Sequence, residues 1–60
     1  MSLNEARLYF GLECQVLLAS GESLFGIVGY TRIADIDFIL VGDSARVRVE
    51  DIDDIRVLKS

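Results

Sequence analysis

The most conspicuous group of reactive side chains lies near the end of the 60-residue chain, at Glu50, Asp51, Asp53 and Asp54. Hard divalent cations prefer carboxylate oxygens, but the spacing lacks the Asp-x-Asp-x-Asp-Gly order of a calcium-binding EF-hand loop. We therefore predict no metal site. Two interpretations stay open: a solvated turn whose aspartates cap free N–H groups, or an acidic surface that repels phosphates and favours a basic protein partner.

A second group of side chains has the chemistry to contact single-stranded RNA. Guanidinium forks match phosphate oxygens, and an aromatic ring can stack on an unpaired base. Among the residues of these types, the candidates for RNA contact are Tyr30, Arg32, Arg46 and Arg48. The alternative is that the arginines are ordinary outward-facing strand charges, and that the tyrosine fills a core or an interface.

Side chains suited to catalysis are sparse. The chain has no His and a single Cys, which excludes His-containing triads, Cys/His zinc sites and an internal disulfide. Cys14 alternates with Val16 on an apolar face and has no positive neighbour, so we expect a buried, unreactive thiol. Asp35 and Asp37 are spaced like paired carboxylates for acid–base work, but so small a domain without insertions offers them no pocket. We expect no enzyme, no catalytic residue and no cofactor.

Composition indicates self-association. The chain is 52% hydrophobic and carries a net charge of −4. A domain of this size buries only about 60% of its unfolded surface, so surplus apolar side chains need a partner surface. No segment reaches the roughly 18 apolar residues of a membrane-spanning helix. We expect a cytoplasmic homo-oligomer with no membrane partner, and its candidate interface residues are Phe25, Ile27, Val47, Val57 and Leu58.

One short helix should begin the chain. Ser2 and Glu5 have the spacing of a capping box, and apolar residues recur with helical period over residues 3–10. Gly11 stands where a left-handed helix end belongs. A helix this short needs a surface on which to dock.

The rest of the chain has the two-residue period of strands. The predicted strands cover residues 13–19, 23–31, 37–41, 45–49 and 55–58. Gly26 and Gly29 predict a sharp bend in the second strand, and residues 32–36 are predicted as a connection. Residues 50–54 are acidic and few, which favours a 3₁₀ turn. The sequence therefore predicts one all-β domain over residues 1–60: a five-stranded, SH3-like small barrel with a short N-terminal helix and a 3₁₀ turn before the last strand.

Residues 16–30, VLLASGESLFGIVGY, resemble the first motif of the Sm/LSm/Hfq superfamily, with its turn glycine and its terminal aromatic residue. The apolar segment 38–41 is similar to the third strand of that fold, and residues 47–58 to its last two strands. The resemblance covers nearly the whole chain. It implies a barrel with an N-terminal helix, rings in which the fourth strand pairs with a neighbour's fifth, and binding of single-stranded RNA.

Three features depart from that family. Thr31 stands where the family has Asp, segment 38–41 lacks the embedded Asn, and residues 50–54 have neither the Arg-Gly of Sm proteins nor the Lys-His of Hfq. The chain resembles the Rho inhibitor Rof and YolD-like proteins about as well, which implies an acidic protein-binding or nucleic-acid-mimicking adaptor. We therefore carry both functions forward: a homo-oligomeric ring that binds RNA, and an acidic adaptor.

Overall fold

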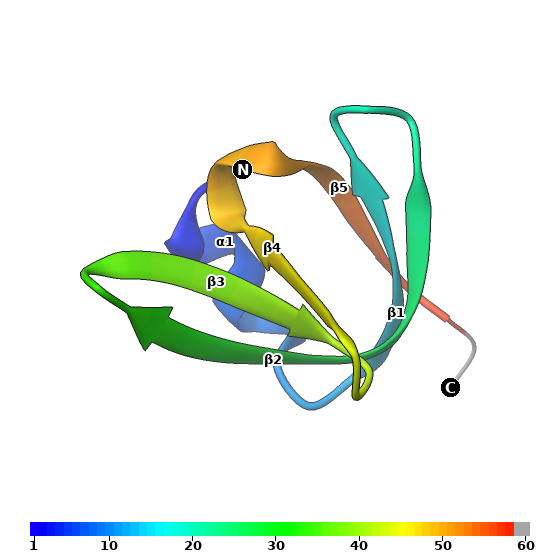
Figure 1. Ribbon diagram of the computed structural model, residues 1–60. Helices are drawn as coiled ribbons and strands as arrows, with labels where there is room; N and C mark the ends of the chain where they lie inside the picture. Colours follow the sequence, from blue (N-terminus) through cyan, green and yellow to red (C-terminus); the bar gives the residue numbers. More distant parts are fainter. Residues whose placement is uncertain (59–60) are drawn as a thin grey trace.

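The computed structural model describes residues 1–58 of the chain. Its elements are α1 (Leu3–Ala6), the 3₁₀ turn η1 (Arg7–Tyr9), β1 (Glu13–Leu18), β2 (Ser23–Ile33), β3 (Ile36–Val41), β4 (Ala45–Arg48), the 3₁₀ turn η2 (Val49–Asp51) and β5 (Ile52–Val57). The strands form one antiparallel sheet in the order β4-β3-β2-β1-β5 (Figure 1). This confirms the all-β class, the short helix and the 3₁₀ turn before the last strand.

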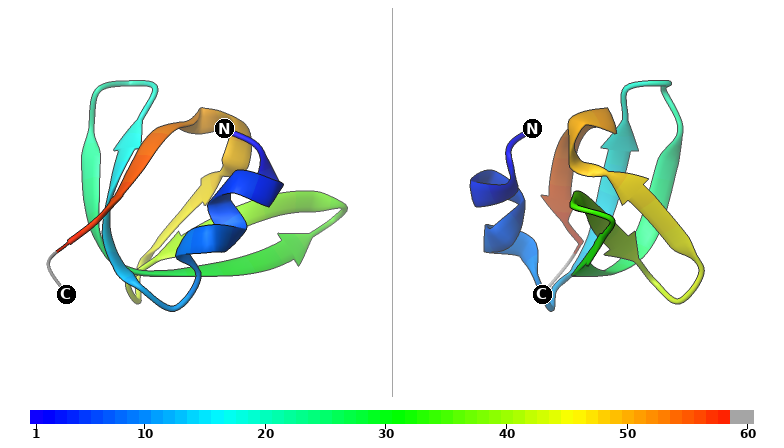
Figure 2. Two further views of the ribbon diagram at one scale, coloured as in Figure 1. Left: turned by 180° about the vertical axis from the view of Figure 1, so that it is seen from behind. Right: turned by 60° about the vertical axis from the view of Figure 1, so that its left-hand side comes forward.

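The sheet is strongly curved but stays open. β4 and β5 are its two edges, and no ladder joins them within residues 1–58. The N-terminal helix covers the open side of the curve (Figure 2), where Ala6 is fully buried. Nearby, the Met1 ammonium donates a hydrogen bond to the carbonyl of Ile52 at 3.2 Å. The five strands predicted as a small barrel therefore form a curved sheet that does not close, and a helix covers its open side.

The long strand β2 supplies the curvature, because it changes partner at its middle. Residues 23–27 pair with β1, and residues 28–33 pair with β3. A Cβ atom at Gly26 would lie 2.7 Å from the amide nitrogen of Gly42, so only glycine allows these backbones to approach. At Gly29 a Cβ would lie 3.6 Å from the Cβ of Leu40, an ordinary contact. The close approach that the bend requires is therefore at Gly26 and not at Gly29.

The N-terminal helix begins as predicted but changes form early. The Ser2 hydroxyl accepts from the Glu5 amide at 3.3 Å, and the Glu5 carboxylate accepts from the Ser2 amide at 3.0 Å, which confirms the capping box. The helix is α-helical only to Ala6 and then tightens into η1, as short helix ends commonly do. Gly11 adopts φ +85° and donates its amide to the carbonyl of Val28 at 2.8 Å, which ties the helix end to β2.

The hairpin between β2 and β3 is longer than predicted. Residues 32–36 do not form a loose connection, because β2 runs to Ile33 and β3 begins at Ile36. Ala34 and Asp35 alone make the turn, with φ of 51° and 66°. Two central residues with positive φ match the twist of a tight hairpin. The sequence did not predict this turn, because it has no glycine at the positions with positive φ.

The last strand begins earlier than predicted. Ile52 and Ile55 are both buried, at 2% and 3% exposure, although they are three positions apart and strict alternation would place them on opposite faces. The register resolves this: Leu17 pairs with Asp54 and Leu18 with Ile52, so Asp53 is the extra residue of a bulge. Residues 52–54 of the acidic segment therefore belong to β5, and η2 covers Val49–Asp51.

One cluster of apolar side chains fills the concave side of the sheet. Its fully buried members are Ala6, Cys14, Val16, Val28, Ile39, Val41, Ile52 and Ile55. Cys14 lies in this core as predicted, and burial raises the pKa of its thiol. Within residues 1–58, no helix has the length and apolar character needed to cross a membrane.

Candidate functional site

The structure divides the four residues predicted to contact RNA between the two faces of the sheet. Residues paired across antiparallel strands share a face. Tyr30 pairs with the fully buried Ile39, which places it on the face toward the core, here called the inner face. Arg32 follows on that face. Arg46 and Arg48 alternate with the inward-facing Val47 and therefore lie on the opposite, outer face.

On the inner face, Tyr30 and Arg32 form a self-contained group with Phe10 and Asp37, which we call the tip cluster. The Tyr30 hydroxyl donates to Asp37 Oδ1 at 2.6 Å, and Arg32 Nε lies 3.7 Å from the same oxygen. The Phe10 ring stacks on Tyr30 with 5.8 Å between ring centroids. The hydrogen bond to Asp37 raises the pKa of Tyr30. The ring and the hydroxyl of Tyr30 both have partners within the chain.

On the outer face, Arg46 and Arg48 lie beside apolar side chains of β3. Arg48 pairs with Phe38 and Arg46 with Leu40 in the strand register. The Arg46 guanidinium lies over the Phe38 ring, 5.1 Å from its centroid, which is a cation–π contact. Arg46 has no ion pair within residues 1–58, whereas Arg48 Nη1 meets Glu50 Oε2 at 3.3 Å. We call Phe38, Leu40, Arg46 and Arg48 the outer arginine face.

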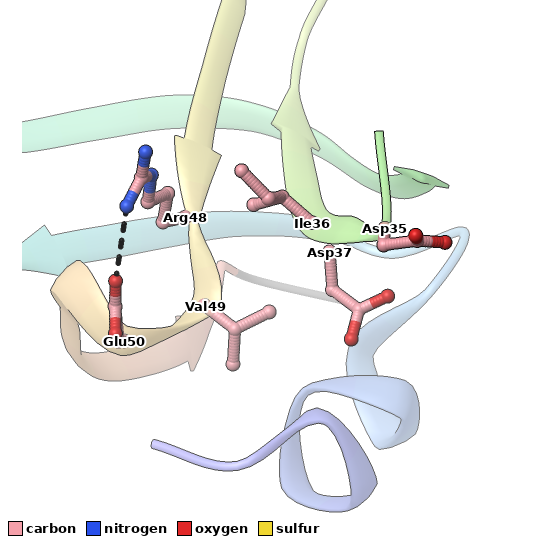
Figure 3. Close-up of a pocket in the computed structure, with 6 residues that line it drawn as sticks. All are labelled: Asp35, Ile36, Asp37, Arg48, Val49 and Glu50. Carbon is pink, nitrogen blue, oxygen red and sulfur yellow. Dashed lines mark hydrogen bonds and ion pairs between the residues drawn. The ribbon is translucent and has the colours of Figure 1, made fainter. Parts of the chain in front are cut away.

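A shallow hollow of about 330 Å³ lies between the β2–β3 turn and η2 (Figure 3). Its lining residues are Asp35, Ile36, Asp37, Arg48, Val49 and Glu50. Figure 3 shows Arg48 and Glu50 on one side and the two aspartates on the other, with Val49 between them. The carboxylates of Asp35 and Asp37 do not point toward one another, and Asp37 accepts from Tyr30. The hollow therefore brings together no carboxylate pair suited to acid–base chemistry.

Of the four acidic residues of η2 and β5, two form ion pairs within residues 1–58 and two do not. Glu50 contacts Arg48, and Asp54 Oδ2 lies 3.3 Å from Arg56 Nε while its other oxygen caps the Ile55 amide. Asp51 and Asp53 are exposed and form no ion pair within residues 1–58. No group of three or more potential metal ligands comes together in this described part. Asp54 therefore accepts a backbone N–H, but it lies in β5 and not in a turn, and two carboxylates remain available to a partner.

Three of the five predicted interface residues are well exposed: Phe25 at 62%, Ile27 at 59% and Val57 at 50%. Phe25 and Ile27 lie side by side on the outer face of β2. Ile27 also lines a groove of about 390 Å³ together with Gly29 and Leu40. Apolar side chains are therefore exposed along β2 and near one sheet edge, as the composition indicated.

The other two predicted interface residues have partners within the chain. Val47 is half-buried against the core because its cross-strand neighbour is Ile39 on the inner face. Val47 therefore packs against the core from the edge strand β4, and its part in an interface stays a prediction. Leu58 is half-buried, and its amide donates to the carbonyl of Glu13 at 2.9 Å, which continues the β1–β5 ladder past the end of β5.

Nothing in the sequence singled out Phe38 as a partner of arginine, because residues 38–41 are apolar on both faces of the strand. Only Ile39 and Val41 are buried, while Phe38 and Leu40 remain partly exposed. The available signal was the alternation of arginines along β4. Those arginines need a face of the sheet that is open to solvent, and the β3 residues paired with them lie on the same face.

Comparison of the chain with known protein families, curated proteins and solved structures found no match, so its likeness to the Sm superfamily rests on the sequence motifs alone.

Proposed function

We propose that the chain is a non-enzymatic binding module that assembles with copies of itself into a ring and binds single-stranded RNA. The observation that carries the proposal is the open sheet, whose edge strands β4 and β5 each pair with a neighbour on one side only within residues 1–58. Unpaired strand edges are templates for further pairing. Because the two edges are different strands, pairing β4 of one copy with β5 of the next gives a head-to-tail contact. Such contacts form a ring when the rotation between successive copies closes on the first copy.

Exposed apolar side chains support the same assembly. Val57 is half exposed on β5, one of the two edges, and Phe25 and Ile27 are exposed on the outer face of β2. Each buried apolar side chain of this size contributes about 1.5–3 kcal/mol. An assembly that covers these residues removes their exposed apolar surface from water.

Size-exclusion chromatography with light scattering tests the assembly. We expect a discrete multiple of the 6.7 kDa chain, and a single chain at high concentration would overturn the ring. Val57→Asp should dissociate the assembly by placing a charge at the β5 edge. Ile33→Asp is the matched control, because Ile33 is exposed at 43% on the β2–β3 hairpin, away from both edges.

RNA binding is tested by fluorescence anisotropy of a labelled single-stranded RNA at low and at moderate salt. Arginine–phosphate contacts release counterions, so affinity should fall steeply as salt rises, with a log–log slope of about −0.7 per phosphate contact. The absence of binding at low salt would reject the RNA proposal while leaving the ring untouched.

A second function is favoured by the two unpaired carboxylates. Asp51 and Asp53 are exposed and flank the start of β5. In a ring their charge is repeated in every copy, which attracts basic proteins and repels nucleic acid. An acidic adaptor predicts that a basic partner is captured and is lost with Asp51→Lys plus Asp53→Lys, and that RNA binds no better than to a neutral protein of this size.

A further inference from the structure

The outer arginine face has the elements needed to bind a nucleotide. The Arg46 guanidinium is exposed, has no carboxylate partner within residues 1–58, and is positioned over the Phe38 ring at 5.1 Å. Arg48 faces the same side, in register with Phe38. A hollow of about 420 Å³ adjoins Arg46, lined by Leu40 and by the β3–β4 turn. A guanidinium held against an aromatic ring, with an open hollow beside it, suits the binding of a flat anionic ligand.

In the tip cluster, by contrast, the aromatic ring and the guanidinium already have partners within the chain. Tyr30 is stacked on Phe10 and donates to Asp37, and Arg32 lies beside the same carboxylate. A base or phosphate binding there must displace contacts that the chain already makes. Asp37 also adds a negative charge directly at the site. The two groups therefore differ in one respect: within residues 1–58 the outer arginine face has a guanidinium without an ion pair, that of Arg46, and the tip cluster has none.

We propose that an unpaired nucleotide of RNA binds on the outer arginine face, with its base stacked on the Arg46 guanidinium held by Phe38 and its phosphate bound by Arg48. Arginine planes and aromatic rings are the usual stacking partners of splayed bases, and a guanidinium matches two phosphate oxygens. This inference rests on the proposed RNA-binding function and assigns its site. Tyr30 and Arg32 are then structural residues and make no contact with RNA.

Two carboxylates face this site and set its affinity. Glu50 lies 3.3 Å from Arg48, and both side chains are more than half exposed, at 71% and 51%. Exposed pairs of this kind contribute little stability, so a phosphate can replace Glu50 at small cost. Asp43 lines the hollow next to Arg46. Removing the Glu50 charge should therefore strengthen RNA binding, because the phosphate no longer competes with Glu50 for Arg48 and is no longer repelled by it.

The test measures the dissociation constant of a fluorescein-labelled single-stranded oligoadenylate for a set of variants by anisotropy at low salt. Arg46→Gln and Phe38→Leu should each weaken binding about tenfold, within the range of one base–aromatic stacking contact. Arg48→Gln should weaken it and reduce the magnitude of the salt slope by about 0.7. Arg32→Gln, which removes the same charge on the inner face, should change affinity less than about twofold.

Glu50→Gln provides a readout that misfolding cannot imitate, because it should tighten binding severalfold. Asp51→Asn is its matched control, since it removes the same charge from a residue that makes no ion pair with Arg48. Circular dichroism establishes that each variant is folded. If the wild-type chain binds but Arg32→Gln weakens it as much as Arg46→Gln, the site is overturned and the RNA function stands. If the wild-type chain does not bind, the RNA function fails and the site fails with it.

Discussion

The two faces of the β2–β3–β4 part of the sheet use alternate residues of the same strands in opposite ways. On the inner face, Val28, Ile39 and Val41 are at most 2% exposed, and the polar side chains beyond them satisfy one another in the tip cluster. On the outer face, Ile27 and Ile33 are exposed, and Arg46 has no ion pair within residues 1–58. Burial and internal pairing mark the face that makes the fold. Unpaired groups mark the face available for contact.

The largest test of this contrast uses two neighbouring residues of β3. Ile39→Ala should lower the free energy of unfolding by about 2–5 kcal/mol, since it leaves a cavity in the core. Leu40→Ala removes a similar volume from the partly exposed outer face and should cost about 1 kcal/mol. Urea denaturation followed by circular dichroism measures both. Equal losses would show that the outer face is also part of the packed core.

The two glycines of β2 give a second matched pair. Gly26→Ala should destabilise the chain by about 1–3 kcal/mol, because its Cβ would lie 2.7 Å from the Gly42 nitrogen and the backbones must separate. Gly29→Ala meets only ordinary contacts on the outer face and should change stability by less than about 0.5 kcal/mol. Thermal melts measure the difference. A tolerated Gly26→Ala would remove the close approach as the origin of the bend.

Substitutions in the turn that joins β2 to β3 should increase the stability of the chain. Ala34 and Asp35 hold positive φ without glycine, a conformation that Asn-Gly adopts at little cost. The double change Ala34→Asn with Asp35→Gly should raise the free energy of unfolding by about 1 kcal/mol. Asp35→Ala keeps the strain and should give no gain. A lower melting temperature for the Asn-Gly variant would contradict the turn geometry.

The smallest expected effect concerns alkaline pH and the tip cluster. The pKa of Tyr30 is raised in the folded chain, first by its hydrogen bond to Asp37. This contribution to stability is therefore present below the ordinary tyrosine pKa of about 10 and is lost as pH rises through the raised value. Absorbance titration should show the pKa of Tyr30 fall in Asp37→Asn. A Tyr30→Phe chain should show a shallower alkaline decline of stability, and an unchanged decline would contradict the bond.

Sequence reasoning recovered most elements but not the register that assigns side chains to faces. The capping box at Ser2 and Glu5 and the alternation in β1 and β4 are local signals, and they predicted their elements. The turn at Ala34 and Asp35 carries no glycine, so the hairpin register was missed. Without that register, nothing in the sequence shows that Tyr30 lies opposite Ile39.

The start of β5 was missed for a related reason. The bulge at Asp53 breaks the two-residue period, so the buried Ile52 and Ile55 do not alternate as strand residues normally do. Charge density over residues 50–54 then favoured a turn. Both errors occurred where backbone geometry departs from the regular strand, and such departures are set by packing that a single sequence does not display. Residue types therefore suggested the candidate residues, but their placement on the two faces of the sheet needed the structure.

The continuity of β2 has a consequence for how this protein can change. One uninterrupted strand hydrogen-bonds to β1 along its first part and to β3 along its second, so no hinge separates the two parts of the sheet. Deleting or inserting one residue within it would reverse the orientation of every later side chain in the strand, exposing Val28 or burying Arg32. Length variation should therefore be tolerated at the β1–β2 and β3–β4 turns and be lethal to folding inside β2.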